Sequence, residues 1–465
     1  GSKGNVGCAV EYTGPGVASL SVPERATITN MGAELGVTGS VFPSDDATRA
    51  FLKAQGREDV WRELAPDPDA AYDRVIDIDL SALEPLVACP SNPGNIKTVA
   101  EVGPIDVHQV VIGSCTNSSF MDMRMVAKVL KDRVVSPGVS VGFSPGSRQV
   151  LEMLSREGYL ADLVNAGSRL LESACGPCIG QGFSPASGTV TVRTFNRNFA
   201  GRTGTKGDQC YLVSPETAVA TALTGKLTDP RTLDIPYPER TMPERFLVDD
   251  RLIIPPDAPG APQREIIRKE TIGSPPVCSA VPDPLEVAVV LKVGDKITTD
   301  HIMPAGTYLK YRSNIPVYAQ YVFECFSEPG KMTFAERCTA LKERGRSAAI
   351  VAGESYGQGS SREHAAICPM HLGVRLVVAQ SIERIHAANL INFGIVPLIF
   401  GDRAAYETLA EGDTIRVEGI REQLKPGQTV RATVTKSDGT SETLVLGHEL
   451  SAEDIETVLK GGRLI

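Results

Sequence analysis

The sequence contains no run of about 18 apolar residues, the minimum length of a transmembrane helix. Its first four residues, Gly-Ser-Lys-Gly, include no apolar signal-peptide segment, and a leading Gly-Ser is typical of a tag remnant. No internal repeat is evident. We therefore expect a protein that does not associate with membranes, and the sequence leaves open where the natural chain begins.

Basic residues are also in the minority. Lys and Arg number 47 against 56 Asp and Glu, which gives a formal net charge of −9 and a pI near 5.4. This balance, together with the lack of a basic stripe, argues against standing affinity for nucleic acid or anionic membranes. An acidic protein can still bind an anion where a few arginines converge.

Cysteine is sparse, with ten residues in 465, which is too few for a disulfide scaffold. Three of them, Cys115, Cys175 and Cys178, form a pattern of their own. The other seven stand alone and are expected to be buried, reduced thiols of a cytoplasmic protein. These seven are Cys8, Cys89, Cys210, Cys278, Cys325, Cys338 and Cys368.

The chain has 465 residues and a mass of 49.6 kDa, which is enough for roughly two to four domains. Residues 230–284 hold twelve of the 32 prolines and show little periodicity. Because proline interrupts helices and favours extended backbone, this segment is expected to be an interdomain linker.

Before the linker, strand-like and helical patterns alternate. Residues 110–112 and 190–195 are apolar or β-branched, and residues 121–132 have helical spacing. Ser214 followed by Pro215 is a helix start, and Gly225 is the expected stop. Alternation of this kind predicts α/β layers with a largely parallel sheet.

After the linker, short apolar strands alternate with helical stretches that begin near Ser360 and Ser381, and the end of the chain is rich in strands that we expect to be antiparallel. The strands are expected at 285–291, 348–352, 374–379, 395–400, 414–417, 430–434 and 442–446. We interpret this part as a separate α/β domain closed by β-structure.

The three remaining cysteines occur in two glycine-containing turns. Cys115 follows the strand at 110–112, while Cys175 and Cys178 form a C-x₂-C loop. A redox pair would leave Cys115 without a role, and a zinc site would need a fourth ligand. An iron–sulfur cluster with three thiolates would leave one iron open as a Lewis acid. Spacing alone leaves all three interpretations open.

Several segments resemble the signature blocks of the aconitase superfamily, in the family order and across essentially the whole chain. They are residues 10–16, 113–119, 174–181, 195–202, 298–301 and 357–364. The resemblance implies a [4Fe–4S] cluster held by Cys115, Cys175 and Cys178. It also implies aconitase-like three-layer α/β domains followed by a C-terminal swivelling β/β/α domain.

The domain boundaries implied by the resemblance follow from these blocks. Residues 1–100 would be the remnant of the family's second α/β domain, and residues 101–229 would form the iron–sulfur cluster domain. Residues 230–284 would be the linker, and residues 285–465 the swivelling domain. The family's N-terminal domain would be absent, or would be supplied by a partner chain.

Arginines dominate the substrate site that the resemblance implies. Arg197 and Arg202 would grip substrate carboxylates, and Asn196 would support the surroundings of the cluster. Arg312 and Arg362 match two further substrate arginines, and a guanidinium fork suits a carboxylate. Most surface arginines are simply solvated, so the assignment depends on the motif.

Ser360 has two competing interpretations. Ser360-x-x-Glu363 before an apolar run is a capping box, which is a purely structural role. The family motif instead assigns Ser360 as the base that removes a carbon-bound proton, with Ser361 and Arg362 binding substrate. A serine base requires a desolvated, cationic pocket that lowers the pKa of its hydroxyl.

Three more residues complete the implied catalytic set. Asp300 and His301 would lie in the active site, with Asp300 holding an arginine or a histidine. Glu11 would orient a histidine that belongs to the absent N-terminal domain. Because the six histidines of this chain match no such block, the chain alone is expected to turn over slowly or not at all.

The resemblance implies reversible dehydration of citrate to isocitrate through cis-aconitate, and Arg312 favours a substrate with a third acidic group. The alternatives are an isomerase of a citrate analogue such as homoaconitate, methylcitrate or a phosphorus-bearing citrate, a cluster-free RNA-binding form, and an inactive fragment.

Overall fold

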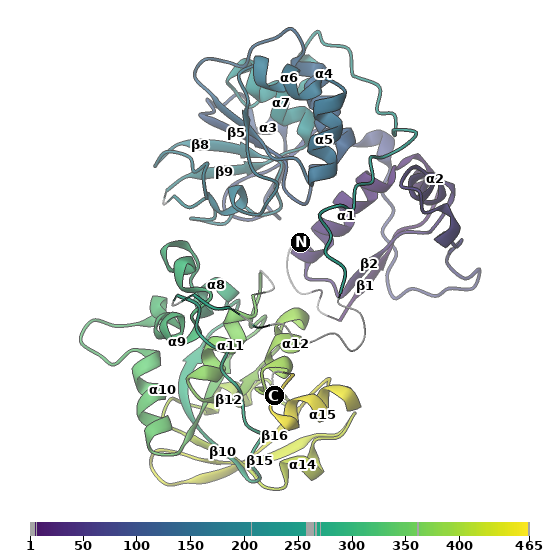
Figure 1. Ribbon diagram of the computed structural model, residues 1–465. Helices are drawn as coiled ribbons and strands as arrows, with labels where there is room; N and C mark the ends of the chain where they lie inside the picture. Colours follow the sequence, from purple (N-terminus) through teal and green to yellow (C-terminus); the bar gives the residue numbers. More distant parts are fainter. Residues whose placement is uncertain are drawn as a thin grey trace. The chain divides into compact units, whose positions relative to one another are not determined.

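The computed structural model describes residues 5, 7–205, 207–256, 265, 267–269, 271–359 and 362–463. The chain divides into two compact units, residues 1–260 and 261–465 (Figure 1). The division falls inside the proline-rich segment that the sequence marks as a linker. Each unit is described by itself.

The first unit begins with a small lobe built around helix α1, Val22–Leu35. Strands β1, Ala9–Glu11, and β2, Gly39–Val41, pair in parallel, and α2 spans Asp46–Ala54. A capping box fixes the start of α1, and Gly36, with φ at 79°, ends it. Three short 3₁₀ helices, Pro15–Ser19, Glu58–Val60 and Leu80–Ala82, complete the connections.

Arg25 attaches α1 to the start of α2. Its side chain is buried, and its Nη1 and Nη2 atoms donate to the two carboxylate oxygens of Asp45 at 2.8 and 2.7 Å. The same guanidinium also donates to the carbonyls of Val17, Leu20 and Pro43. This bidentate pair, with every donor direction used, fixes the orientation of α1.

The rest of the first unit is built on a seven-stranded sheet in the order β4-β3-β9-β8-β5-β6-β7. Five neighbouring strands are parallel, and β3 and β4 are antiparallel. The strands are β3 Leu86–Ala88, β4 Ile96–Thr98, β5 Gln109–Ile112, β6 Ser140–Phe143, β7 Arg169–Leu170, β8 Val190–Arg193 and β9 Gln209–Leu212. Since β3 and β4 precede residue 101, the expected domain boundary at residue 100 falls after two strands that belong to this sheet.

The two faces of this sheet are covered differently. Val110 and Ile112 of β5 pack into a large core with the helices, whereas Val111 packs on the other face with Cys178 and Phe195. The helices are α3 Val99–Val102, α4 Phe120–Leu130, α5 Arg148–Arg156, α6 Tyr159–Asn165 and α7 Pro215–Thr224 (Figure 1). The loop with the C-x₂-C pair therefore lies against the sheet itself.

Several local predictions for this unit are confirmed. The helix expected at 121–132 is α4, and the strand expected at 190–195 is β8 followed by the start of a loop. Ser214 is the N-cap of α7, and its hydroxyl accepts a hydrogen bond from the N–H of Thr217. Gly225 ends α7 in the left-handed conformation, as expected for a C-cap glycine.

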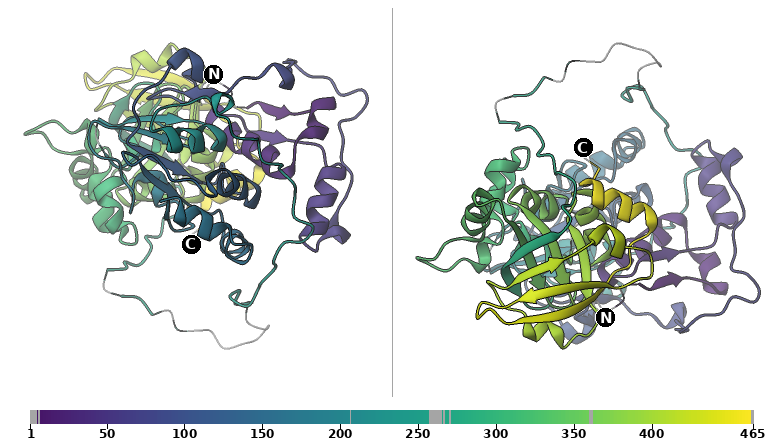
Figure 2. Two further views of the ribbon diagram at one scale, coloured as in Figure 1. Left: turned by 90° about the horizontal axis from the view of Figure 1, so that it is seen from above. Right: turned by 90° about the horizontal axis from the view of Figure 1, so that it is seen from below.

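The second unit is a closed barrel in the order β10-β11-β12-β13-β16-β15-β14 (Figure 2). β10 to β13 are parallel, and the pairs that include β14, β15 or β16 are antiparallel. One core cluster takes side chains from all seven strands. The strands are β10 Leu285–Val293, β11 Ser347–Ala352, β12 Val374–Ala379, β13 Val396–Phe400, β14 Thr414–Val417, β15 Val430–Thr435 and β16 Ser441–Gly447.

A second core cluster lies outside the barrel, where β10 to β12 pack against the helices. These helices are α8 Thr299–Ile302, α9 Ile315–Tyr318, α10 Phe334–Glu343, α11 His364–His371 and α12 Arg384–Asn392. The helices α13 Ala405–Thr408, α14 Ile420–Gln423 and α15 Ala452–Lys460 follow, and 3₁₀ turns lie at Gly306–Tyr311, Ala319–Tyr321 and Glu324–Phe326. The mixed α/β class and the β-rich end of the chain are as expected.

The helix expected to begin near Ser360 begins later, at His364, with Glu363 in the N-cap position and no side-chain cap. Gly357 and Gly359 have φ angles of 86° and 108°, which a right-handed helix cannot accommodate. Ser360 and Ser361 lie outside the described residues, so no cap is assigned to either.

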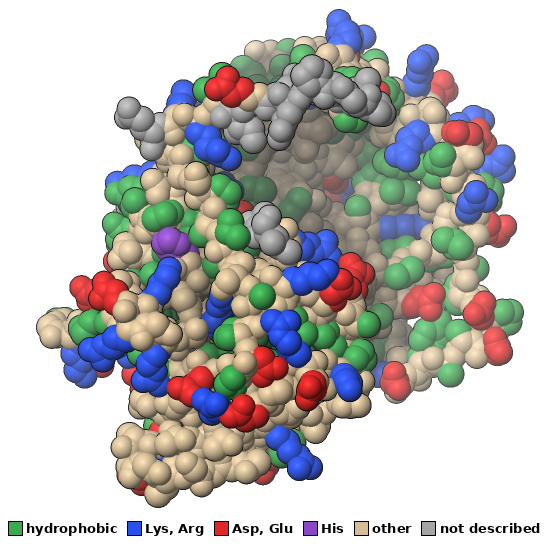
Figure 3. Space-filling model, turned by 60° about the horizontal axis from the view of Figure 1, so that its bottom comes forward, with side chains coloured by type: hydrophobic (Ala, Val, Ile, Leu, Met, Phe, Trp, Pro, Cys, Tyr) green, Lys and Arg blue, Asp and Glu red, His purple; other side chains and the backbone are tan. Residues whose placement is uncertain are grey.

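Within the described part of the chain, no helix is both long and apolar enough to cross a bilayer. On the face drawn in Figure 3, basic and acidic side chains are interspersed.

The Arg25–Asp45 pair predicts a pH-dependent stability. The hydrogen bonds from Arg25 lower the pKa of Asp45 below its usual value. Their contribution is therefore complete above the unfolded pKa of about 3.9 and is lost as the pH falls through the lower folded pKa. Asp45→Asn, which keeps an N-cap for α2, should lower the free energy of unfolding by about 1.5–3 kcal/mol at pH 7. In urea titrations this difference should shrink below about pH 4.

The matched control is Glu58→Gln, which removes the exposed ion pair of Arg49 with Glu58. Its effect should stay below about 1 kcal/mol at both pH values. A loss in Asp45→Asn that does not change with pH would contradict the assigned role of the charge.

Candidate active site

The first cysteine turn follows β5. Gly113 has φ at 140°, and a Cβ on it would lie 2.4 Å from the carbonyl oxygen of Ser144, so only glycine fits this position. Ser114 then carries its hydroxyl to 3.7 Å from the Sγ of Cys115 and 3.6 Å from the Sγ of Cys178. Two of the three expected thiols therefore meet at one hydroxyl.

The C-x₂-C loop ends in a short 3₁₀ turn, Pro177–Ile179, that buries Cys178 and leaves Cys175 exposed. Burial raises the pKa of the Cys178 thiol, and the charges of Cys175 and Cys115 raise it further. The hydrogen bond with Ser114 and the charge of Arg202 act in the opposite direction. Cys175 and Cys115 are thus close enough to Cys178 for their charges to act on its thiol.

This arrangement bears on the three interpretations of the cysteines. Across the described residues, no three His, Cys, Asp or Glu side chains converge closely enough to hold one metal ion. Cys115, Cys175 and Cys178 thus do not form a single-ion site among the described residues, which leaves the cluster and the redox pair as interpretations.

The arginine loop follows β8, which is the parallel neighbour of β5 in the sheet. Because both strands end at the same edge, the arginine loop and the first cysteine turn emerge side by side. The Nε atom of Arg197 lies 2.8 and 3.0 Å from the two carboxylate oxygens of Glu34, and the Asn196 amide donates to Glu34 at 2.9 Å. The guanidinium of Arg202 lies over the ring of Phe199, with its carbon 5.5 Å from the centroid.

Two residues of α1 that the sequence interpretation missed reach into this site. The Asn30 amide donates to the Sγ of Cys115 at 3.3 Å and accepts from the Thr116 hydroxyl at 3.1 Å. Glu34, one turn further along α1, is the carboxylate that pairs with Arg197. The available signal was the spacing of four between Asn30 and Glu34, which places both on one helix face.

The cysteine and arginine loops are in backbone contact. A Cβ on Gly180 would lie 1.9 Å from the carbonyl oxygen of Thr203 and 2.6 Å from the hydroxyl of Ser184. Gly180 also has φ at 83°, so its conformation and its contact both require glycine. The distance between the two loops is therefore set by backbone atoms.

The second unit holds another group of the expected residues. The Nη1 atom of Arg362 donates to Asp300 at 2.5 Å, and the two side chains are 15% and 32% exposed. Burial raises the pKa of Tyr318 to about 12, whereas the charges of Arg362 and Arg312 lower it. Both guanidinium groups therefore lie near Tyr318. The backbone carbonyl of Arg312 is also 2.9 Å from His364 Nε2.

His301 and Glu11 have other partners. The Nδ1 atom of His301 accepts a hydrogen bond from the Thr298 N–H at 3.1 Å, which closes the capping box of α8. The carboxylate of Glu11 accepts from the Tyr72 hydroxyl at 2.6 Å and raises the pKa of that phenol. Neither contact links these residues to the cysteine or arginine loops.

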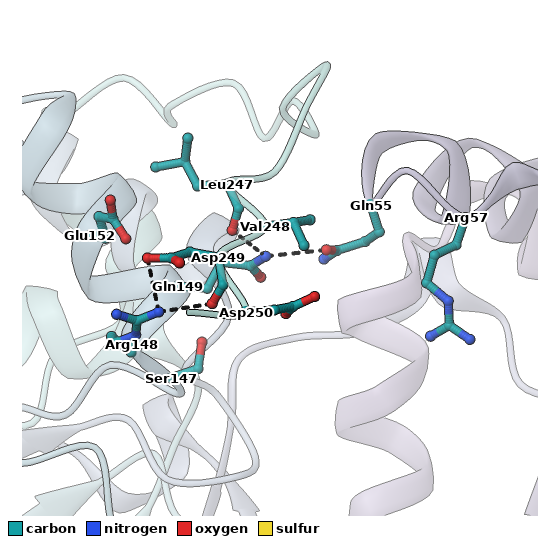
Figure 4. A pocket seen from close by; sticks show the side chains of 10 residues that line it. All are labelled: Gln55, Arg57, Ser147, Arg148, Gln149, Glu152, Leu247, Val248, Asp249 and Asp250. Atoms are coloured by element: carbon teal, nitrogen blue, oxygen red, sulfur yellow. Dashed lines mark hydrogen bonds and ion pairs between the residues drawn. The ribbon is translucent and has the colours of Figure 1, made fainter. Parts of the chain in front are cut away.

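A pocket of about 420 Å³ lies elsewhere in the first unit (Figure 4). Arg148 and Asp249 form an ion pair at 3.1 Å in it, and the Gln149 amide bridges the Leu247 carbonyl and Gln55 (Figure 4). None of the expected site residues lines this pocket. The candidate site is instead the edge of the sheet at β5 and β8.

Comparison with known proteins decides the family. The family model described as the aconitase family (aconitate hydratase) matches residues 1–106 and 95–225, and the model of the aconitase C-terminal domain matches residues 317–403. A mitochondrial aconitate hydratase of Gracilaria gracilis is 34% identical over 99% of this chain and 66% of its own length. The chain belongs to the aconitase family.

Other relatives of this aconitase-family chain carry more than one activity in their names. A probable mitochondrial aconitate hydratase of Caenorhabditis elegans and the mitochondrial homocitrate dehydratase of Saccharomyces cerevisiae are each 32% identical over 99% of this chain. The chain spans 66% of the length of either. A crystal structure of 3-isopropylmalate dehydratase from Methanocaldococcus jannaschii is 26% identical, with a TM-score of 0.29, and the match covers 38% of this chain and 89% of that one.

The contact of Gly180 with Thr203 predicts a position-specific cost. Gly180→Ala and Gly182→Ala both place an alanine at positive φ, 83° and 78°, which costs about 1–2 kcal/mol. Only at Gly180 does the added Cβ meet backbone; at Gly182 it meets nothing within 4 Å. In urea titrations Gly180→Ala should therefore lose at least about 2 kcal/mol more than Gly182→Ala. Equal losses would show that the two loops are free to separate.

Proposed function

We propose that this chain forms the cluster-binding and substrate-binding part of a hydro-lyase that converts citrate to isocitrate through cis-aconitate. The observation that carries the proposal is the shared edge of β5 and β8. There the Ser114 hydroxyl links Cys115 and Cys178, and α1 links Cys115 to the arginine loop. A thiol set beside guanidinium groups suits a metal cluster that handles a carboxylate substrate.

The residues fit a [4Fe–4S] cluster in number and in chemistry. Cys115, Cys175 and Cys178 are three free thiols, the Asn30 amide donates to the Sγ of Cys115, and the Ser114 hydroxyl lies within hydrogen-bonding distance of Cys115 and Cys178. When bound, a cluster with three protein thiolates supplies one open iron as a Lewis acid toward a substrate hydroxyl.

Substrate carboxylates would be held by arginines that neighbouring carboxylates already orient. Arg197 uses its Nε edge for Glu34, which fixes the guanidinium and directs its remaining donors elsewhere. In the second unit Asp300 fixes Arg362 in the same way. Each pair presents a pre-oriented fork, which reduces the entropy lost when a carboxylate binds.

Proton removal is assigned to Ser360, with Ser361 and Arg362 on the substrate. Ser360 would take a proton from the carbon next to the hydroxyl-bearing carbon, as hydroxide leaves and a double bond forms. A serine of ordinary pKa cannot do this, so nearby positive charge is required. Arg312 and Arg362, both close to Tyr318, are the cations that the second unit can supply.

Hydroxide departure also needs an acid. Asp300, His301 and Glu11 remain the proposed members of the catalytic set. Glu11 is exposed and could meet a histidine of the polypeptide that corresponds to the unmatched third of the relatives. We therefore propose that this polypeptide, in the same chain or in a partner, completes the active site.

Homocitrate is the second candidate substrate, because a homocitrate dehydratase is as similar to this chain as several aconitate hydratases. Arg312 fits a third carboxylate, which citrate and homocitrate share. We also propose that the protein is cytoplasmic, because all ten of its cysteines are free thiols.

The cluster proposal predicts a metal content. Anaerobic reconstitution should give about four irons and four sulfides per chain. Cys115→Ser, Cys175→Ser and Cys178→Ser should each lose most of this content, because each removes one of three anchoring thiolates. Cys8→Ser, at an exposed free cysteine, is the control that should retain it. Stoichiometric zinc without acid-labile sulfide, or an unchanged iron and sulfide content in Cys175→Ser, would contradict the proposal.

The assignment of Ser360 predicts a kinetic split. In the active holoenzyme Ser360→Ala should lower kcat by roughly 10²–10⁴ with little change in KM, since only proton transfer is removed. Arg312→Lys should mainly raise KM, because the bidentate fork is lost. Steady-state rates and a melting curve separate the alternatives. Near-normal turnover with a lowered Tm in Ser360→Ala would assign Ser360 a structural role instead.

A further inference from the structure

Arg193, the last residue of β8, carries a buried charge that the mechanism above does not use. It is 1% exposed, and its guanidinium lies over the ring of Phe195, 5.4 Å from the centroid. Nε donates to the Thr191 hydroxyl at 3.2 Å, Nη2 to Gln109 Oε1 at 3.0 Å, and Nη1 to the Pro177 carbonyl at 2.9 Å. All three acceptors are neutral.

No carboxylate among the described residues forms an ion pair with Arg193. Asp208 is near enough to act on its charge, but the Asp208 carboxylate accepts its hydrogen bond from Thr203. Burial lowers the pKa of Arg193 by more than the charge of Asp208 raises it, so the cation is only partly compensated. Burying a charge without a counter-charge costs several kcal/mol, so an anion close to this guanidinium would be strongly favoured.

The position of Arg193 indicates which anion this is. The Pro177 carbonyl belongs to the residue just before Cys178, so Nη1 is bonded to the loop that carries two of the thiols. Cys178 and Cys210 are the thiols whose charges act on Arg193. Burial raises the pKa of Cys210 to about 12, so that thiol stays neutral and cannot supply the charge.

We propose that Arg193 is a positioning residue of the cluster site: its buried charge offsets the net negative charge of a thiolate-ligated cluster, and its bond to Pro177 fixes the C-x₂-C loop. The inference rests on the proposed function. A [4Fe–4S] core with three thiolates is an anion, and at this depth the attraction is screened far less than at the surface.

Two substitutions separate charge from shape. Arg193→Met removes the charge and keeps an aliphatic side chain of similar length, whereas Arg193→Lys keeps the charge and loses the fork. Arg124→Met is the matched control. Arg124 is also buried, lies over a phenylalanine ring at 5.3 Å and donates to a threonine hydroxyl, but it belongs to α4 on the helical face of the sheet.

The experiment uses the anaerobically reconstituted chain and three readouts: iron and sulfide content, the reduction potential of the cluster, and urea unfolding with and without the cluster. In Arg193→Met the potential should become more negative, because a nearby positive charge that favours the reduced form is gone. Loss of iron to a chelator should be roughly tenfold faster. Arg193→Lys should keep a potential close to that of the unsubstituted chain, and Arg124→Met should change neither.

The free energy of unfolding of the cluster-free form separates the proposed role from a purely structural one. Without its anion the buried charge is destabilising, so Arg193→Met should be at least as stable as the unsubstituted cluster-free chain. A purely structural arginine would instead make Arg193→Met less stable. With the cluster bound it should be less stable. If Arg193→Met does not fold, Arg193→Gln supplies the neutral variant, since its amide can still donate to Pro177.

The outcomes distinguish the two proposals. An unsubstituted chain that binds no iron and sulfide overturns the proposed function, and the role of Arg193 with it. A chain that binds the cluster, but in which Arg193→Met leaves the potential unchanged and lowers stability equally with and without the cluster, overturns only the role of Arg193.

Discussion

The backbone contact between Gly180 and Thr203 is the constraint on which the first unit's site depends. It holds the C-x₂-C loop so close to the arginine loop that only glycine fits at position 180. The strand order places the first cysteine turn beside both, because β5 and β8 are parallel neighbours. Helix α1 then connects the two loops through Asn30 and Glu34. Loops that would otherwise be independent thus behave as one rigid edge.

The net charge of this protein does not describe the charge around the candidate site. The chain as a whole is acidic, at −9, but Arg193, Arg197 and Arg202 follow one another from the end of β8 onward, and the charges of Arg193 and Arg202 interact with Cys178. One of these arginines is paired with a carboxylate from another element, and one has only neutral partners. In a partly buried site the few nearest charges outweigh the many distant ones, since water screens the latter. The acidic surface and an anion-binding site are therefore compatible.

Local signals in the sequence were sufficient to predict most helices and strands, and to single out the loops that carry the candidate site. Ser214, Pro215 and Gly225 mark both ends of α7, and the β-branched runs mark β8, β12 and β14. The sequence could not assign β3 and β4 to the main sheet, because alternation within a strand does not identify its partner. Asn30 and Glu34 escaped notice for a related reason: a polar pair on one helix face looks the same whether it meets solvent or a strand end. The turn before α11 depends on the positive φ angles of Gly357 and Gly359, which the Ser360-x-x-Glu363 pattern does not reveal.

The closed barrel of the second unit has a consequence for the order of events during synthesis. β13 pairs with β16, and β16 is joined to β10 through β15 and β14, so the barrel cannot close until residue 447 has left the ribosome. By that point the whole seven-stranded sheet of the first unit, with all three cysteines of the candidate site, has been released. Domains fold as units and in chain order where they can. The three thiols of the candidate site are therefore present while the barrel is still incomplete, so binding of the proposed cluster need not wait for the end of translation.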